Sequence, residues 1–132
     1  MDDNCLVHFS CVESTLLITG GFESAEIYLP NRDSACVLPD LPDSRQDHSQ
    51  DGLLLCGGYY SSRSCRRWNT DTGAWDLVTE SLTEKRWDHI SWTPADGSVT
   101  YLMGGYSCDN TSDVIDNDGS VSTSFPMRNS TL

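Results

Sequence analysis

The sequence has few basic residues. Among its 132 residues, eight are Lys or Arg and 20 are Asp or Glu, so the formal net charge at pH 7 is −12. Binding to nucleic acid or to an anionic membrane requires a basic surface that neutralises phosphates. The composition therefore disfavours both classes of partner. It is more typical of a surface that keeps a protein soluble than of one that recognises a basic partner.

Long hydrophobic runs are also missing. Hydrophobic residues make up 37% of the chain, and no window shows sustained helical periodicity. No stretch is long enough to span a membrane as a helix. The acidic start, Met1 to Cys5, has no apolar run behind it, so no secretory signal peptide is predicted. The many Gly, Ser, Asp and Asn residues favour a turn-rich all-β chain of one domain's size.

No cysteine pair has the C-x-x-C spacing of a zinc site, although the chain has six cysteines, at positions 5, 11, 36, 56, 65 and 108. The even count and the sequons at Asn110 and Asn129 suit a secreted protein. The absence of a signal peptide points the other way. Two interpretations stay open: a piece of a larger secreted protein, or a reduced cytosolic protein with buried thiols.

Motifs of several enzyme classes are absent as well. There is no G-x-S-x-G element and no glycine-rich phosphate loop, and Asp113–Gly119 lacks EF-hand spacing and is interpreted as a hairpin turn. The dipeptides Asp47-His48 and Asp88-His89 resemble general-base pairs, but neighbours on a strand point to opposite faces. We therefore expect no enzyme activity and no catalytic, metal or cofactor residues. The Arg and His side chains of these two motifs should instead hydrogen-bond loops between repeats.

What the sequence does contain is a short apolar run that ends in a double glycine, and it occurs three times, at Gly20-Gly21, Gly57-Gly58 and Gly104-Gly105. The spacing, roughly 40 residues, is typical of repeat architectures. Arg45-Gln46-Asp47-His48 and Arg86-Trp87-Asp88-His89 recur in the same order relative to the glycines. Each unit is expected to hold four short strands joined by hairpins. The strands expected from the pattern are 6–12, 16–19, 25–29, 35–38, 53–56, 65–69, 74–78, 99–103, 113–115 and 121–125.

This arrangement resembles the kelch repeat. The matching features are the three double glycines and the aromatic residues that follow them, Tyr28, Trp68 and Trp75. In the third unit Ile115 and Val121 stand at the two aromatic positions, and in the first unit Val37 or Cys36 stands at the tryptophan position. The structural repeat positions are Gly20, Gly21, Gly57, Gly58, Gly104, Gly105, Trp68, Trp75, Arg45 and Arg86.

The resemblance implies a β-propeller of usually six or so blades, each a four-stranded sheet. The chain offers about two complete blades plus partial blades. The units run roughly over 5–39, 45–80 and 86–125, and a fourth begins near 126. Repeats need neighbours to bury their faces. We therefore expect a fragment of a larger propeller, the product of a truncated gene model, or a segment that closes the ring by self-association.

The expected function is a non-catalytic protein-interaction scaffold. Its binding loops would follow the double glycines and present Tyr59, Tyr60 and Tyr106 as contact anchors, although packing on adjacent loops would also explain these tyrosines. Cys56 and Cys65 flank a hairpin, which permits a disulfide, and a buried free Cys56 is the alternative. The alternative function is a fragment of a secreted galactose-oxidase-like enzyme whose active site lies outside this chain.

Overall fold

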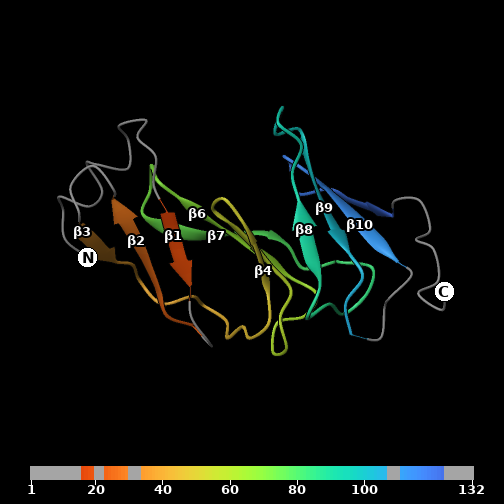
Figure 1. Ribbon diagram of the computed structural model, residues 1–132, viewed down its shortest axis with the longest axis horizontal. Helices are drawn as coiled ribbons and strands as arrows, with labels where there is room; N and C mark the ends of the chain where they lie inside the picture. Colours follow the sequence, from red (N-terminus) through yellow and green to blue (C-terminus); the bar gives the residue numbers. More distant parts are fainter. Residues whose placement is uncertain (1–15, 20–22, 30–33, 107–110, 124–132) are drawn as a thin grey trace.

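Three antiparallel sheets follow one another along the long axis of the molecule in chain order (Figure 1). The computed structural model describes residues 16–19, 23–29, 34–106 and 111–123, and these residues contain strands and turns but no helix. This result confirms the all-β prediction. The first sheet has the order β1-β2-β3, formed by β1 (Leu16–Thr19), β2 (Ala25–Leu29) and β3 (Ser34–Val37).

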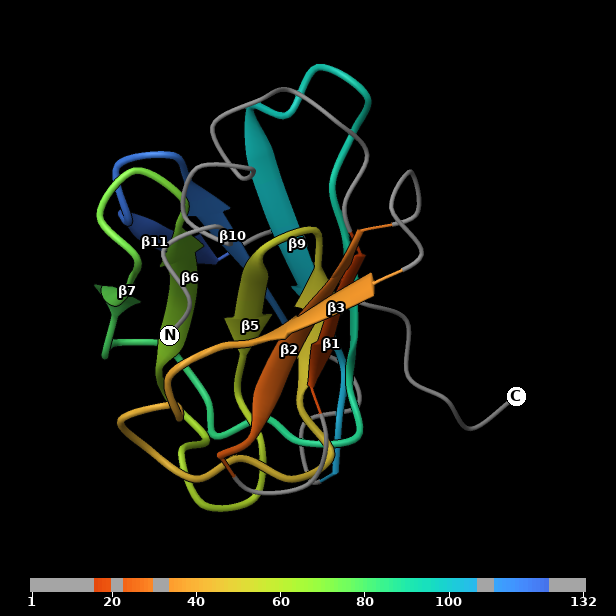
Figure 2. The ribbon, with the colours of Figure 1, turned by 90° about the vertical axis from the view of Figure 1, so that its left-hand side faces the viewer.

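The second and third sheets have four strands each, and neighbours in sequence are neighbours in the sheet. The second sheet comprises β4 (Ser49–Asp51), β5 (Leu54–Cys56), β6 (Cys65–Asn69) and β7 (Ala74–Thr79). The third comprises β8 (Ile90–Trp92), β9 (Val99–Met103), β10 (Ser112–Asp116) and β11 (Val121–Thr123). Seen from the end of the first sheet, β1–β3 lie in front of β5 and β6, with β9 and β10 behind them (Figure 2).

Most expected strands are present with small shifts at their ends. β3 begins and ends one residue earlier than expected, and β10 extends one residue beyond the prediction at each end. The segments now seen as β4 and β8 had not been assigned as strands. The strand expected at 6–12 and the end of the last one, 124–125, lie outside the described residues.

A hydrophobic interior fills the space between the first and second sheets. Trp68 and Trp75 lie opposite each other on β6 and β7, with ring centroids 5.2 Å apart in an edge-on arrangement. The indole N–H of Trp75 donates to the carbonyl oxygen of Pro39 at 2.9 Å, so its one polar atom is satisfied. The buried members of this interior are Leu17, Ala25, Ile27, Leu38, Leu41, Leu55, Trp68 and Trp75.

A second interior lies between the second and third sheets. Its buried members are Leu54, Cys56, Cys65, Leu82, Leu102 and Ile115. All three residues of β5 are buried, because Leu55 faces the first sheet while Leu54 and Cys56 face the third. A strand covered on both faces should read as a continuous apolar run rather than an alternating one. This double burial explains the apolar run that precedes Gly57.

The pairing registers show that the sheets are structural repeats of one another. Trp68 lies opposite Trp75 in the second sheet, and Ile115 lies opposite Val121 in the third, as the kelch-like alignment expects. In the first sheet the residue opposite Tyr28 is Ala35. The assignment of Val37 or Cys36 to the tryptophan position was therefore wrong. The register of the β2–β3 hairpin places Ala35 at this position, and the sequence alone did not fix that register.

Candidate interaction surface

Arg45 is fully buried at the start of the second sheet and clamps the loop that joins β5 to β6. Its guanidinium donates to the carbonyl oxygens of Gly57 at 2.8 Å and Ser64 at 2.7 Å, and to the Ser64 hydroxyl at 2.7 Å. It also pairs with Asp43 at 3.2 Å. Burial lowers the pKa of Arg45, and the charge of Asp43 opposes this shift. The side chain binds both ends of the loop between β5 and β6.

Arg86 binds the corresponding loop of the third sheet, with its acidic partner on a different element. It donates to the carbonyl oxygen of Gly104 at 2.8 Å and to the hydroxyl of Thr111 at 3.1 Å. Its Nε pairs with Asp113 at 2.9 Å, and both side chains are fully buried. Each arginine thus bonds the loop of its own sheet. The expectation that these arginines would hydrogen-bond loops between repeats holds only for the pair of Arg45 with Asp43, which lies in the connection between the first and second sheets.

The histidines of the two motifs do reach the preceding sheet. His48 Nε2 lies 2.9 Å from the Thr19 hydroxyl, and His89 Nε2 lies 2.8 Å from the Ser49 hydroxyl. Burial, followed by the charge of Arg86, lowers the pKa of His89 to about 4, so this imidazole is neutral near pH 7. A neutral, buried histidine bonded to a hydroxyl of the preceding sheet is a structural link.

The double glycines allow the loops of neighbouring sheets to pack closely against each other. Gly57 and Gly104 have φ of 68° and 67°, and Gly58 and Gly105 have φ of 109° and 118°. A Cβ on Gly57 would collide with the carbonyl oxygen of Arg86 and with the ring of His89. Only glycine adopts these conformations at low cost while leaving room for the loop of the next sheet. Gly20 and Gly21 lie outside the described residues.

Four aromatic side chains gather where these loops meet, and we call them the aromatic strip: Tyr60, Tyr59, Trp87 and Tyr106. Tyr59 contacts Tyr60 and Trp87, with ring centroids 5.1 and 5.6 Å apart. Trp87 in turn stacks on Tyr106 at 5.3 Å, with the ring planes 22° apart. The three tyrosines are 56–63% exposed. The strip is therefore both packed within itself and open to solvent.

In the second and third sheets, the same type of backbone hydrogen bond positions a tyrosine of the strip. The amide of Tyr59 donates to the carbonyl oxygen of Gln46 at 2.7 Å, and the amide of Tyr106 donates to that of Trp87 at 2.9 Å. Sequence reasoning selected the tyrosines but missed Trp87. The available signal was its place in the Arg-x-Asp-His motif, one residue after the arginine that holds the tyrosine loop.

A shallow hollow of about 430 Å³ borders the Tyr60 end of the strip. Its lining carries both charge signs and several hydroxyls, and comprises Tyr60, Ser61, Ser62, Arg63, Ser64, Glu80 and Lys85. The strip and the hollow share one loop, because residues 59–64 supply parts of both. This size falls within the range of roughly 300–1,000 Å³ that is usual for ligand sites.

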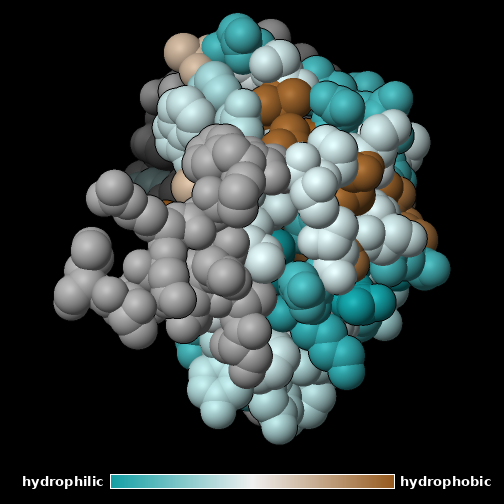
Figure 3. Space-filling view, turned by 90° about the vertical axis from the view of Figure 1, so that its right-hand side faces the viewer, coloured by the Kyte–Doolittle hydropathy of each residue, from teal (hydrophilic) through white to brown (hydrophobic). Residues whose placement is uncertain are grey.

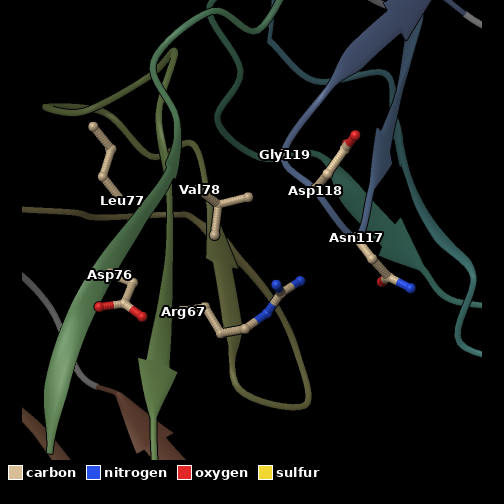
Figure 4. Close-up of a pocket in the computed structure, with 7 residues that line it drawn as sticks. All are labelled: Arg67, Asp76, Leu77, Val78, Asn117, Asp118 and Gly119. Carbon is tan, nitrogen blue, oxygen red and sulfur yellow. The ribbon is translucent and has the colours of Figure 1, made fainter. Parts of the chain in front are cut away.

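A second, smaller crevice separates β7 from the turn that follows β10 (Figure 4). Its volume is about 170 Å³, and Arg67 extends into it from β6 toward Asn117. A Cβ on Gly119 would collide with the carbonyl oxygen of Val78, so the two sheets touch closely at this end. The crevice is below the roughly 300 Å³ of a typical ligand pocket and is best described as a packing seam.

Cys56 and Cys65 form a disulfide with a sulfur–sulfur distance of 2.16 Å. They are directly opposite each other on β5 and β6, and both are buried against the third sheet. Among the described residues there is no group of three His, Cys, Asp or Glu side chains that could hold a metal ion. The same residues include no helix long and apolar enough to cross a membrane.

No protein-family model matches the chain, and no curated protein matches it either. The kelch resemblance therefore rests on the residues named above and on the repeated sheets, and it stays a prediction.

Proposed function

We propose that the chain is a non-catalytic interaction module in which the three sheets are blades of a kelch-type β-propeller segment. The aromatic strip is its binding surface for a protein partner. Three observations support a propeller segment: antiparallel sheets of three, four and four strands stacked face to face, a repeated register, and repeated double glycines at the same backbone angles.

The composition of the aromatic strip supports the proposal that it binds a protein partner. Tyr and Trp are enriched at the energetic centres of protein interfaces, because they bury large areas and lose little conformational entropy. Here buried arginines fix the loops that carry the tyrosines, and the rings pack on one another, so little further ordering is needed on binding. Asp88 follows Trp87 directly and is exposed, which favours a partner that offers Arg or Lys to the ring faces.

Selection from a random peptide display library tests this function. We expect enriched peptides with basic or aromatic residues, and we expect Trp87→Ala to weaken their binding by at least about tenfold, which is about 1.4 kcal/mol. Trp92→Ala is the matched control, because it removes the same kind of ring from an exposed position on β8, away from the strip. Peptides that bind wild type and Trp87→Ala equally well, or a library that yields no enriched peptide, would contradict the proposal.

A further inference from the structure

The outer face of the third sheet is built like a face that is buried elsewhere in the molecule. Gly57 follows β5 as Gly104 follows β9, so Tyr101 and Met103 occupy the positions of Leu54 and Cys56. Leu54 and Cys56 form the interior between the second and third sheets. Their counterparts face the opposite way from Leu102, which is buried against the second sheet, and therefore face away from the rest of the chain.

This outer face is apolar and exposed. Ile90 and Trp92 are 64% and 55% exposed, and Trp92 stacks on Tyr101 with ring centroids 5.6 Å apart. The pairing of Ile90 with Met103, Trp92 with Tyr101 and Tyr101 with Val114 makes the face continuous across three strands. Hydrophobic residues, coloured brown, lie among pale ones on the end of the molecule that carries this sheet (Figure 3). Side chains of this kind in a row usually mark an interface.

The first sheet presents the complementary face at the other end. Tyr28 and Ala35 occupy the positions of Trp68 and Trp75, which pack against the preceding sheet. They point away from the second sheet, because Ile27 and Cys36 beside them pack toward it. Val37 lies on the same outward face and is 73% exposed. The outer face of the third sheet is thus equivalent to one side of an internal interface between sheets, and the outer face of the first sheet is equivalent to the opposite side.

We propose that the outer face of the third sheet docks on the outer face of the first sheet of a second copy of the chain. Two such contacts, related by a two-fold axis, close a ring of two copies. Two copies of three sheets give six, which lies within the four to eight blades that close a propeller. The contact repeats the interface already present between the second and third sheets, and closure leaves no sheet face free to extend the assembly.

The mass of the purified chain in solution tests this inference. Native mass spectrometry and light scattering over a range of concentrations should show a species of twice the chain mass. Trp92→Asp and Val37→Asp should each raise the dissociation constant at least tenfold, because each places a carboxylate in an apolar contact. Circular dichroism and the unfolding midpoint verify that each variant is folded, which is expected because both side chains are exposed.

Tyr106→Asp is the control, because Tyr106 is exposed in the aromatic strip and should leave the dimer unchanged. That control separates this inference from the proposed binding function. A wild-type chain that remains monomeric at all concentrations would overturn the inference, and so would assemblies that keep growing beyond two copies. Loss of the dimer in Trp92→Asp but not in Val37→Asp would overturn it as well, since that pattern requires third sheets to contact each other.

Discussion

Arg86 and Asp113 form an ion pair in which both side chains are fully buried. Such a pair stabilises a protein only if the remaining polar atoms are also satisfied. Arg86 meets this condition by donating to Gly104 and Thr111, and Asp113 by accepting from the hydroxyl of Thr83 at 2.7 Å. The role of these residues is to fix the loop that carries Tyr106. The pattern of the sequence identified Arg86, but not Asp113, because a carboxylate within a strand is expected at an exposed position.

His89 should make the stability of the protein depend on pH. Its pKa is about 4 in the folded chain and 6.5 ordinarily, so the unfolded state binds a proton more readily. The free energy of unfolding is therefore unaffected by His89 above pH 6.5 and falls as the pH drops from 6.5 to 4. The shift corresponds to roughly 3 kcal/mol. Denaturant unfolding at pH 7 and pH 4.5 measures the difference.

His89→Gln is the control for this prediction, because an amide can still bond the Ser49 hydroxyl but does not titrate. The variant should lose less stability than wild type between pH 7 and pH 4.5. The pKa of His48 is lowered in the same direction, chiefly by burial, so part of the pH dependence should persist in the variant. Equal losses in variant and wild type would show that His89 does not contribute.

At the scale of the strand and loop, the sequence predicted most of what short-range signals encode. The apolar run of β5 and the turn that contains Gly119 are specified by neighbouring residues, and they were located correctly. β4 is polar throughout and β8 is only three residues long, so neither gives a clear local signal, and each forms because it pairs with the strand that follows it. The partners of Arg45 and Trp87 depend on distant residues that the local pattern does not encode.

Gly57 should tolerate substitution much less well than Gly52. Both residues have positive φ, 68° and 59°, so alanine costs about 1–2 kcal/mol at either position from backbone strain alone. At Gly52 a Cβ meets nothing within 4 Å, whereas at Gly57 it collides with the backbone of Arg86. We expect Gly57→Ala to lower the free energy of unfolding by at least about 1–3 kcal/mol more than Gly52→Ala. Denaturant unfolding of both variants measures the gap, and equal costs would show that the loop can move aside.

In the whole molecule, the second sheet should be the most resistant to local opening, because it lies between the other two. It is covered on both faces, by the interior that contains Trp68 on one side and the interior that contains Leu54 on the other. The first and third sheets each face only one of these interiors. In a row of repeats, stability is roughly the sum of each repeat and its contacts with neighbours. Local opening should therefore begin in the first and third sheets.

Hydrogen exchange of the Trp92→Asp variant tests this gradient, because the variant removes the proposed contact with a second copy. Amides in β5 and β6 should exchange most slowly, and those in β2 and β9 faster, since an end sheet can open while the middle sheet stays covered on its other face. In wild type at a concentration that favours the proposed dimer, protection of β9 should rise toward that of β5. Peptide-resolved mass spectrometry measures both states. If β5 and β9 exchange at the same rate in the variant, the three sheets open as one unit and the additive description of the row is wrong.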